Sequence, residues 1–396
     1  MSTEQSNPDI VIVAAKRTPM GGFQGSLSSV ASPKLATTAI KAIMAQTGLA
    51  GEQVDEVLMG CVLPAGLGQA PARQATLGAG LPLSVGATTV NKVCGSGMKT
   101  VMLAHDLIKA GSASVIVAGG MESMSQAPYL LDKARGGMRM GHGKVMDHMF
   151  LDGLEDAYTG GAMGTFAQGT ADDFNLTREQ MDRFALNSLE KANAAIERGA
   201  FKEEIAPVTV SSRRGDTLVD TDEQPGNARP DKIPGLRPAF AKDGTITAAN
   251  SSSISDGAAA LMLMTAEQAN SLGLPVLATI KGHATHAQEP SMFTTAPVGA
   301  MNKLLDKVSW SREDVDLFEI NEAFAMVTML AISELSLDES KVNVNGGACA
   351  LGHPIGCSGA RLLVTLIHAL KARGLKRGVA SLCIGGGEAT AMAIEV

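Results

Sequence analysis

The sequence has few aromatic residues, no long hydrophobic run and no cluster of basic residues. One Trp and two Tyr occur in 396 residues, and the net charge is −7. Nucleic-acid-binding proteins usually carry clustered Lys and Arg among aromatic side chains, so that class is excluded. No stretch approaches the roughly 18 apolar residues of a membrane span. The polar segment Met1 to Asp9 lacks the pattern of a secretion signal, so we expect a cytoplasmic protein that binds no membrane.

A disulfide framework is also not expected. The five cysteines, at positions 61, 94, 349, 357 and 383, follow no secretion signal, which predicts reduced thiols. Glycine, in contrast, is abundant with 44 residues, and it predicts tight turns and loops that face a ligand. The length predicts two or three units that share a large core.

Short apolar runs alternate with helical patterns along the chain. Buried strands are predicted at 9–14, 115–118, 275–280 and 379–384. This alternation predicts an α/β architecture with largely parallel sheets that helices cover.

Two segments share one design. Gly97 and Gly359 each lie at the start of a predicted helix, and Lys109 and Lys371 close these helices 12 residues later. A strand that ends in glycines follows each helix. A duplicated half-domain explains this pattern, and the alternative is a chance similarity of two helix–strand units.

Cys94 stands just before the first of these helices, in the segment Asn91-Lys92-Val93-Cys94-Gly95-Ser96-Gly97. The positive end of a helix dipole and nearby N–H groups lower the pKa of a thiol in that position. The pattern therefore predicts a nucleophile. The alternative is a small buried hydrophobic residue, which is common for cysteine.

His353 lies in a glycine-rich stretch between Cys349 and Cys357. Spacings of four residues would suit a zinc site on one face of a helix, but Pro354 and the glycines would break that helix, so no metal site is predicted. A loop that holds one imidazole fits better, because His transfers protons near neutral pH. The alternative is a core histidine with satisfied hydrogen bonds.

Two further motifs follow predicted strands. Cys383 leaves a strand directly into the glycines 385–387, at the edge where open α/β sheets bind ligands. Asn321 follows an apolar run and precedes Glu322. The alternatives are a buried strand cysteine before a glycine turn and an asparagine that caps a helix.

The segment from about 124 to 254 differs from both flanks. It is rich in Met, Gly and charge and has few strand signals. Thr177 and Gln180 form a capping-box pattern ahead of apolar residues at helical spacing. We interpret the segment as an insertion that covers the face carrying the motifs above.

Together these motifs resemble those of the thiolase family. Each is weak alone, but their order along almost the whole chain is specific. The segments that carry the resemblance, besides the one around Cys94, are Arg17-Thr18-Pro19, Gly119-Gly120-Met121-Glu122-Ser123-Met124-Ser125, Leu236-Arg237-Pro238-Ala239-Phe240, Asp256-Gly257-Ala258-Ala259-Ala260, Asn321-Glu322-Ala323-Phe324, Gly352-His353-Pro354-Ile355-Gly356 and Cys383-Ile384-Gly385-Gly386-Gly387.

The resemblance implies two similar α/β halves in a five-layer αβαβα sandwich with an inserted loop domain. The expected bounds are 1–123 with 255–277 for the N-terminal half, 124–254 for the loop domain and 278–396 for the C-terminal half. Proteins of this family are dimers or tetramers, so a homodimer or homotetramer is expected, with the Met-rich stretch 121–150 as the contact between dimers.

The resemblance also implies a reversible Claisen condensation, in which two acetyl-CoA give acetoacetyl-CoA and CoA without a further cofactor. Cys94 would take the acyl group, His353 would activate that thiol, and Cys383 would move the proton of the α-carbon. His353 and a water on Asn321 would stabilise the enolate. The backbone N–H groups of Cys94 and Gly385 would stabilise the tetrahedral intermediate.

Coenzyme A is expected to lie against the inserted segment. The residues expected to contact the substrate are Met163, Phe240, Ala248, Ser252, Phe293, Ala323 and Phe324. The sequence departs from the family pattern at Ala162, Gly226 and Glu388-Ala389, which bears on substrate preference. In place of the arginine often found at 226, Arg229 or Lys232 would contact the nucleotide of CoA.

The expected activity is acetyl-CoA C-acetyltransferase with a preference for short chains, because Phe293 would limit the acyl pocket. One alternative is a degradative 3-oxoacyl-CoA thiolase for longer chains, which uses the same residues. A condensing enzyme of the ketoacyl-synthase type is disfavoured by Cys383. A binding protein without activity would not need both thiols and His353.

Overall fold

The computed structural model describes residues 8–396 and contains one large mixed sheet. Its strands run in the order β12-β13-β14-β11-β1-β10-β5-β3-β4, and β2 pairs with β10. The bounds are β1 Ile10–Arg17, β2 Gly21–Gly22, β3 Glu56–Gly60, β4 Gly86–Val90, β5 Val115–Ser123, β10 Ser255–Thr265, β11 Ala278–Ala287, β12 Leu317–Ile320, β13 Arg377–Ile384 and β14 Glu388–Glu395.

This sheet consists of two parts that repeat one strand order. From the centre outward the first part reads β1-β10-β5-β3-β4 and the second reads β11-β14-β13-β12, and a bridge between Phe318 and Val342 occupies the place of a fifth strand. Within the sheet, the described strands of the two parts pair with each other at only two residue pairs, both between β1 and β11. The duplication expected from the sequence is therefore confirmed in the fold.

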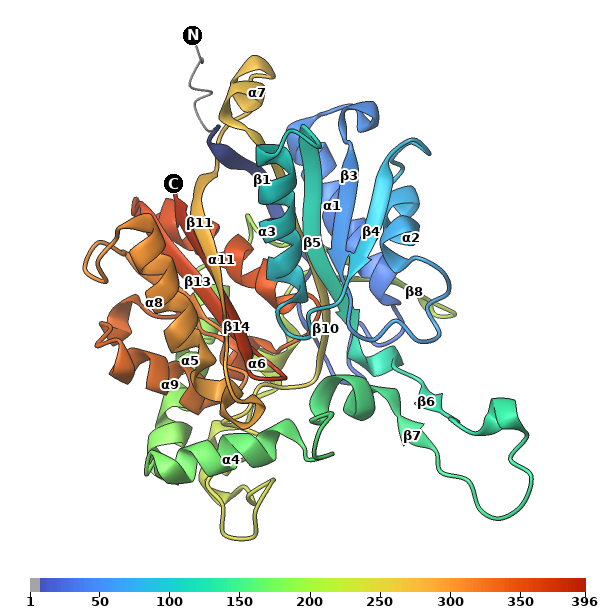
Figure 1. Ribbon diagram of the computed structural model, residues 1–396, viewed down its shortest axis with the longest axis vertical. Coiled ribbons are helices and arrows are strands. Elements are labelled where there is room, and N and C mark those ends of the chain that lie inside the picture. The colour runs from blue at the N-terminus through green and yellow to red at the C-terminus, as the bar shows by residue number, and fades with distance from the viewer. Residues whose placement is uncertain (1–7) are drawn as a thin grey trace.

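Helices form three layers around the two parts (Figure 1). In the middle layer, α3 (Ser96–Lys109) packs against α11 (Ser358–Arg373). The outer face of the first part is covered by α1 (Ser32–Thr47) and α2 (Pro71–Gly78). The outer face of the second part is covered by α8 (Ala296–Val308) and α9 (Ala325–Glu334). The five layers are those of the expected αβαβα sandwich.

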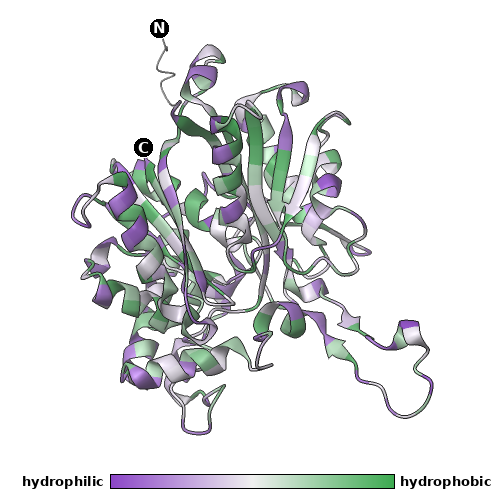
Figure 2. Cartoon of the chain, in the orientation of Figure 1, coloured by the Kyte–Doolittle hydropathy of each residue, from purple (hydrophilic) through white to green (hydrophobic). Residues whose placement is uncertain are grey.

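The strands are apolar on both faces because each face packs against helices. In β1, Ile10 and Ile12 join the core around α3 and α11, whereas Val11 and Val13 join the core beneath α1. Figure 2 shows hydrophobic residues along these strands and hydrophilic residues on the outer helices. Burial on both faces explains why the strands read as continuous apolar runs rather than as alternating ones.

The middle layer is tightest where its two helices begin. A Cβ atom on Gly97 would lie 2.8 Å from the backbone N of Ala360, and one on Gly359 would lie 2.4 Å from the backbone N of Met98. Only glycine permits this approach. The close contact brings together the loops that precede α3 and α11, which carry Cys94 and His353.

The expectation of largely parallel sheets is wrong. Among the described strands of this sheet, parallel pairing is limited to β3 with β4 and β5, and to β12 with β13. Strand β10 runs antiparallel to β1 and β5, and β14 runs antiparallel to β11 and β13. In the second part, β14 follows β13 directly, without a crossover helix, which antiparallel pairing allows. Between β13 and β14 the turn is made by glycines, of which Gly386 and Gly387 have φ of 90° and 86°.

The segment between β5 and β10 carries no strand of the large sheet. Its longest helix, α5, starts at the predicted capping box, where the Thr177 hydroxyl accepts from the Gln180 N–H at 3.2 Å and the Gln180 side chain accepts from the Thr177 N–H at 2.8 Å. The helices and strands of this segment are β6 Tyr129–Leu130, β7 Met146–Asp147, α4 Met163–Asp173, α5 Arg178–Glu197, β8 Val208–Ser212, β9 Gly215–Val219 and α6 Glu223–Asn227. Two short helices lie outside it, α7 Ala266–Ser271 and α10 Ala348–Leu351.

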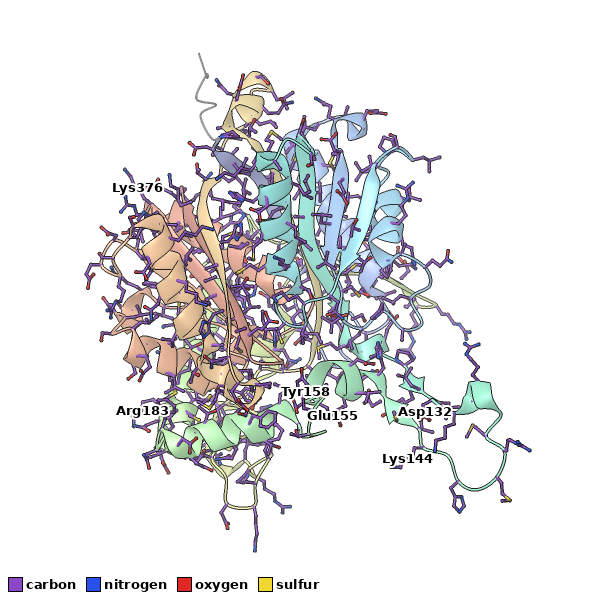
Figure 3. The ribbon with its side chains drawn as sticks, in the orientation of Figure 1. Asp132, Lys144, Glu155, Tyr158, Arg183 and Lys376 are labelled. Carbon is purple, nitrogen blue, oxygen red and sulfur yellow. The ribbon has the colours of Figure 1, made fainter. Side chains whose placement is uncertain are left out.

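The strands β6 and β7 form a hairpin that projects from the body of the molecule (Figure 1). Figure 3 shows Asp132 and Lys144 on this projection. Within residues 8–396, no helix combines the length and the hydrophobicity needed to cross a membrane.

Candidate active site

One cavity of about 380 Å³ lies where α3 and α11 begin and β13 ends. It is lined mostly by apolar side chains. The expected site residues on its wall are Cys94, Met163, Phe240, Ala248, Ser252, Phe293, Ala323, Phe324, His353, Cys383 and Gly385. The structure thus gathers residues from both sheet parts and from the inserted segment around one space.

Cys94 is partly exposed to this cavity, two residues before α3. Burial raises the pKa of its thiol to about 11, although the N–H groups of Gly385 and of Cys94 itself lower it. The sequence predicted that the pKa of Cys94 is lowered, and this prediction is wrong, because the pKa is raised overall. Loss of water around the sulfur outweighs the helix start and the two N–H donors, so the thiol needs a base.

The imidazole of His353 is buried and has a defined orientation. Its Nδ1 contacts the Ser358 hydroxyl, which itself donates to the Pro354 carbonyl at 2.9 Å. The hydroxyl therefore accepts from Nδ1–H, which leaves Nε2 unprotonated and able to accept a hydrogen bond. Burial and, to a smaller extent, the charge of Arg361 together lower the pKa of His353 to about 3. A neutral imidazole with an unprotonated Nε2 can act as a base.

Asn321 lies behind His353 rather than on the cavity wall. Its Nδ2 is 3.4 Å from Nε2 of His353. Its Oδ1 is buried and has no hydrogen-bond partner among residues 8–396. A buried acceptor without a partner suits a water molecule or a substrate atom. The alternative of a helix cap is wrong, because the residue that caps α9 is Phe324.

Cys383 stands near the end of β13 and is 1% exposed. Burial raises the pKa of its thiol well above the ordinary value, and the neighbouring Cys94 raises it further. Both thiols line the same cavity. The turn that follows Cys383 supplies the Gly385 N–H group that acts on Cys94, so the two sheet parts meet at these sulfurs.

A buried carboxylate that sequence reasoning did not single out holds the loops around the cavity. Glu122 accepts from the N–H groups of Val62 at 3.0 Å, Leu63 at 3.1 Å and Gly356 at 2.9 Å. It thereby ties the loop of His353 to β5. A charged residue inside an apolar strand was the available signal, because burying a carboxylate requires several donors.

A second buried carboxylate, Glu322, braces the next loop. It accepts from the Ser188 hydroxyl at 2.7 Å, from the Asn343 amide at 2.8 Å and from the Cys349 N–H at 3.0 Å. Ser188 belongs to α5, so this carboxylate connects the inserted segment to the loop that follows β12.

The three residues that a zinc site would need do not converge. The short helix α10 ends at Leu351, the Cys349 sulfur faces the carbonyl of Glu322 at 3.7 Å, and Cys357 is buried in the core between the sheets. Among the described residues, none of these three belongs to a group with metal-ligand spacing.

Some expected contacts lie elsewhere, and other wall residues were not anticipated. Arg229 and Lys232, the candidates for the CoA nucleotide, are exposed and do not line the cavity. The additional wall residues are Phe150, Gly153, Leu154, Ala162, Gly164, Ala239, Ser251, Ser253, Ile254 and Ile355. Most belong to the inserted segment, where sequence patterns indicated few regular elements.

Comparisons with known proteins agree with this site. The family model described as "Thiolase, N-terminal domain" matches residues 10–267, and the one described as "Thiolase, C-terminal domain" matches residues 274–396. The acetyl-CoA acetyltransferase of Pseudomonas aeruginosa is 52% identical over 388 residues, which cover 98% of this chain and 99% of that protein. Acetyl-CoA acetyltransferase 2 of Arabidopsis thaliana is 52% identical over 399 residues, which cover 100% and 99%.

A solved structure is similar over its full length. The acetyl-CoA acetyltransferase of Bacillus anthracis superposes with a TM-score of 0.96 at 43% identity. The match covers 98% of this chain and 100% of that one.

Proposed function

Because this chain belongs to the thiolase family, we propose that it is an acyltransferase that interconverts two acetyl-CoA with acetoacetyl-CoA and CoA. The observation that carries this proposal is the meeting of two thiols and one neutral imidazole around a single cavity. Acyl transfer needs a nucleophile and a base, and a carbon acid needs a second base.

In the first half-reaction, Nε2 of His353 takes the proton of the Cys94 thiol as the sulfur attacks the thioester carbonyl. The bond from the acyl carbon to the CoA sulfur breaks, and the departing CoA takes the proton from His353. The N–H groups of Cys94 and Gly385 lie beside the sulfur and are proposed to stabilise the oxyanion. The acetyl group is left on Cys94.

In the second half-reaction, Nε2 of His353 takes the proton of the Cys383 thiol, and the resulting thiolate takes a proton from the methyl carbon of a second acetyl-CoA. The resulting carbanion attacks the acyl carbon on Cys94, and the bond from that carbon to sulfur breaks. The enolate oxygen is proposed to face His353 and a water on Asn321, whose Oδ1 has no partner among residues 8–396. The Cys94 thiolate then takes the proton that His353 held, and Cys383 keeps the proton from the methyl carbon, so both thiols are neutral again.

We propose a preference for short acyl chains. Phe293 is 3% exposed, lines the cavity and packs edge-on against Phe324 with ring centroids 6.4 Å apart. A ring fixed in this way limits the room for a longer chain. A kcat/KM that rises steadily from acetoacetyl-CoA to 3-oxooctanoyl-CoA would instead support the degradative 3-oxoacyl-CoA thiolase.

The two-step mechanism is tested by separating its halves. After mixing with acetyl-CoA, Cys383→Ala is expected to accumulate an acetyl adduct on Cys94, because acyl transfer survives when the carbon acid loses its base. Cys94→Ala is expected to form none. Peptide mass spectrometry reads both results, with Cys357→Ala as a control that keeps both thiols of the site. An adduct on Cys349 or Cys357 instead of Cys94 overturns the assignment.

We also retain the proposals of a cytoplasmic location and of a homodimer or homotetramer. All five cysteines are free, which favours a reducing compartment. The projecting hairpin exposes Tyr129 by 68% and Met140 by 98%, and large apolar side chains of this kind commonly mark contacts between subunits. Sedimentation of a variant with both residues changed to Ser tests whether the hairpin joins dimers.

A further inference from the structure

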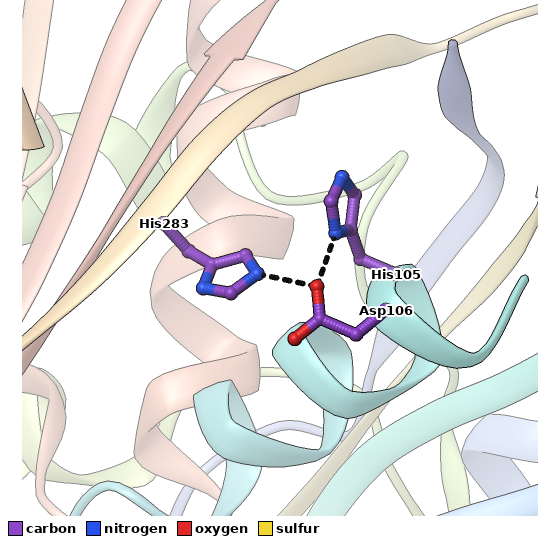
Figure 4. Close-up of side chains that lie close together, drawn as sticks. All are labelled: His105, Asp106 and His283. Atoms are coloured by element: carbon purple, nitrogen blue, oxygen red, sulfur yellow. Dashed lines mark hydrogen bonds and ion pairs between the residues drawn. The ribbon is translucent and has the colours of Figure 1, made fainter. Parts of the chain in front are cut away.

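Two histidines and an aspartate cluster at a place that the proposed reaction does not use. His105 and Asp106 are neighbours near the end of α3, and His283 lies on β11. Nδ1 of His105 is 2.8 Å and Nε2 of His283 is 2.9 Å from the same oxygen, Oδ1 of Asp106. Figure 4 shows both rings turned toward that oxygen, with the second carboxylate oxygen turned away.

We propose that His105, Asp106 and His283 form a binding site for one divalent transition-metal cation of the Zn²⁺ or Co²⁺ type. One nitrogen of each imidazole and one carboxylate oxygen would be the ligands. This site goes beyond the acyl-transfer function and does not depend on it.

The geometry of the three side chains supports this proposal. Their ligand atoms all lie within 4.8 Å of one another. In a tetrahedral zinc site with bonds of about 2.0–2.1 Å, neighbouring ligand atoms lie about 3.3 Å apart. The two contacts of 2.8 Å and 2.9 Å would therefore open by about half an ångström, which rotation of an exposed carboxylate permits. A helix and a strand hold the three side chains, so the site is largely pre-formed.

The donor set selects the class of cation. Two imidazoles and one carboxylate suit Zn²⁺, Co²⁺, Ni²⁺ and Cu²⁺, whereas Mg²⁺ and Ca²⁺ prefer oxygen ligands alone. The positive charges of Lys109 and Lys307 lie nearby and act against a cation, so we expect moderate rather than tight binding.

The position of the site suggests what a bound cation would do. His105 lies nine residues into α3, roughly 14 Å along the helix from its start beside Cys94, so the ion would not touch the reacting groups. α3 packs on the first sheet part, whereas β11 belongs to the second. A cation bound to both would link the two parts and stabilise their packing.

Equilibrium dialysis of the full-length protein against Co²⁺ at neutral pH tests the proposal. The variants are Asp106→Asn, which changes a side chain that is 54% exposed, and His283→Gln. The matched control is His142→Gln, because His142 is an exposed histidine on the projecting hairpin. A circular dichroism spectrum equal to that of the wild type shows that each variant is folded.

We expect the wild-type chain and His142→Gln to bind one Co²⁺ per chain. Asp106→Asn and His283→Gln should bind Co²⁺ at least tenfold more weakly. The thermal unfolding midpoint should rise with Co²⁺ in the first pair only. Equal binding by all four proteins would place the ion elsewhere and overturn the proposal. A wild-type chain that binds no Co²⁺ would also overturn it. Neither result would bear on the acyl-transfer function, which the Cys94 adduct tests separately.

Discussion

The loops that lead into α3 and α11 have the same construction but different chemistry. Before α3, the Ser96 hydroxyl donates to the Val93 carbonyl at 2.7 Å and accepts from the Lys92 N–H. Before α11, the Ser358 hydroxyl donates to the Pro354 carbonyl at 2.9 Å and accepts from His353. Each serine thus stabilises the loop before its own helix, but only the second one also orients an imidazole.

The position two residues before each serine explains the difference. In the first loop it is Cys94, which faces the cavity. In the second it is Gly356, where a Cβ atom would lie 2.6 Å from the Glu122 carboxylate and 2.7 Å from the Met121 carbonyl. The second loop has no room for a side chain there, so it cannot carry a nucleophile. The duplicated scaffold therefore supplies two equivalent loops, and packing decides which one carries the proposed nucleophile and which the proposed base.

Removing the base should have the largest effect. His353→Asn is expected to lower kcat for thiolysis of acetoacetyl-CoA by up to about 10⁴-fold, because a thiol with a raised pKa then lacks a proton acceptor. Steady-state kinetics measures this loss. His368→Asn is the control, since that imidazole contacts the Ala15 carbonyl at 3.1 Å, outside the cavity. Similar losses in both variants would assign His353 a structural role.

The resting state of Cys94 gives the next effect. With the thiol pKa raised to about 11 and that of His353 lowered to about 3, both groups are uncharged at neutral pH. Alkylation of Cys94 by iodoacetamide should therefore accelerate about tenfold per pH unit, roughly 10³-fold between about pH 7 and about pH 10. A rate that is already constant at neutral pH would instead indicate a thiolate–imidazolium pair. Mass spectrometry of the modified peptide assigns the alkylation to Cys94.

The two serines should have smaller and distinguishable effects. Ser358→Ala removes the acceptor of the His353 Nδ1–H and is expected to lower kcat about tenfold, the value of one hydrogen bond to a functional group, and to change the pH profile. Ser96→Ala disturbs only the loop before Cys94 and should lower kcat while the pH profile stays unchanged. Identical profiles in the two variants would contradict the orienting role of Ser358.

Local patterns in the sequence predicted much of the fold. The capping box at Thr177 and the glycines at the starts of α3 and α11 were recognised because each depends on residues a few positions apart. The extent of β5 was not. Its predicted end at 118 precedes glycines, but the strand continues to Ser123, because β10 pairs with it over that whole length. Residue 120 is glycine because a Cβ atom there would lie 2.0 Å from the Gly356 carbonyl oxygen, a contact between segments that are distant in the sequence. The predicted domain bounds of 1–123 with 255–277, 124–254 and 278–396 remain a prediction.

The sequence predicted which residues gather at the cavity better than it predicted the electrostatics there, and their catalytic roles remain a proposal. Cys94, His353 and Cys383 were recognisable from their glycine-rich surroundings and from the family resemblance. The raised pKa of Cys94 was not, because it depends on how much water the folded cavity excludes. The role of Glu122 was equally hidden, since two of its three N–H donors lie about 60 residues before it and the third lies more than 200 residues after it.

The smallest effect should come from the ion pair that joins the two loops at the nucleophile. Lys92, two residues before Cys94, contacts the carboxylate of Glu388, which follows the glycine turn of Gly385. The side chains are 20% and 35% exposed, so the pair contributes about 0.2–1 kcal/mol, and Lys92→Met or Glu388→Gln should lower kcat about twofold to fivefold. Because one interaction is lost in each case, the double variant should be no slower than either single one, and high salt should reduce the difference from the wild type.

Steady-state kinetics of the wild type, the two single variants and the double variant tests this coupling, with Glu395→Gln at the Arg377 pair as a control. Additive losses of kcat would show that the two loops are not coupled through the ion pair of Lys92 and Glu388.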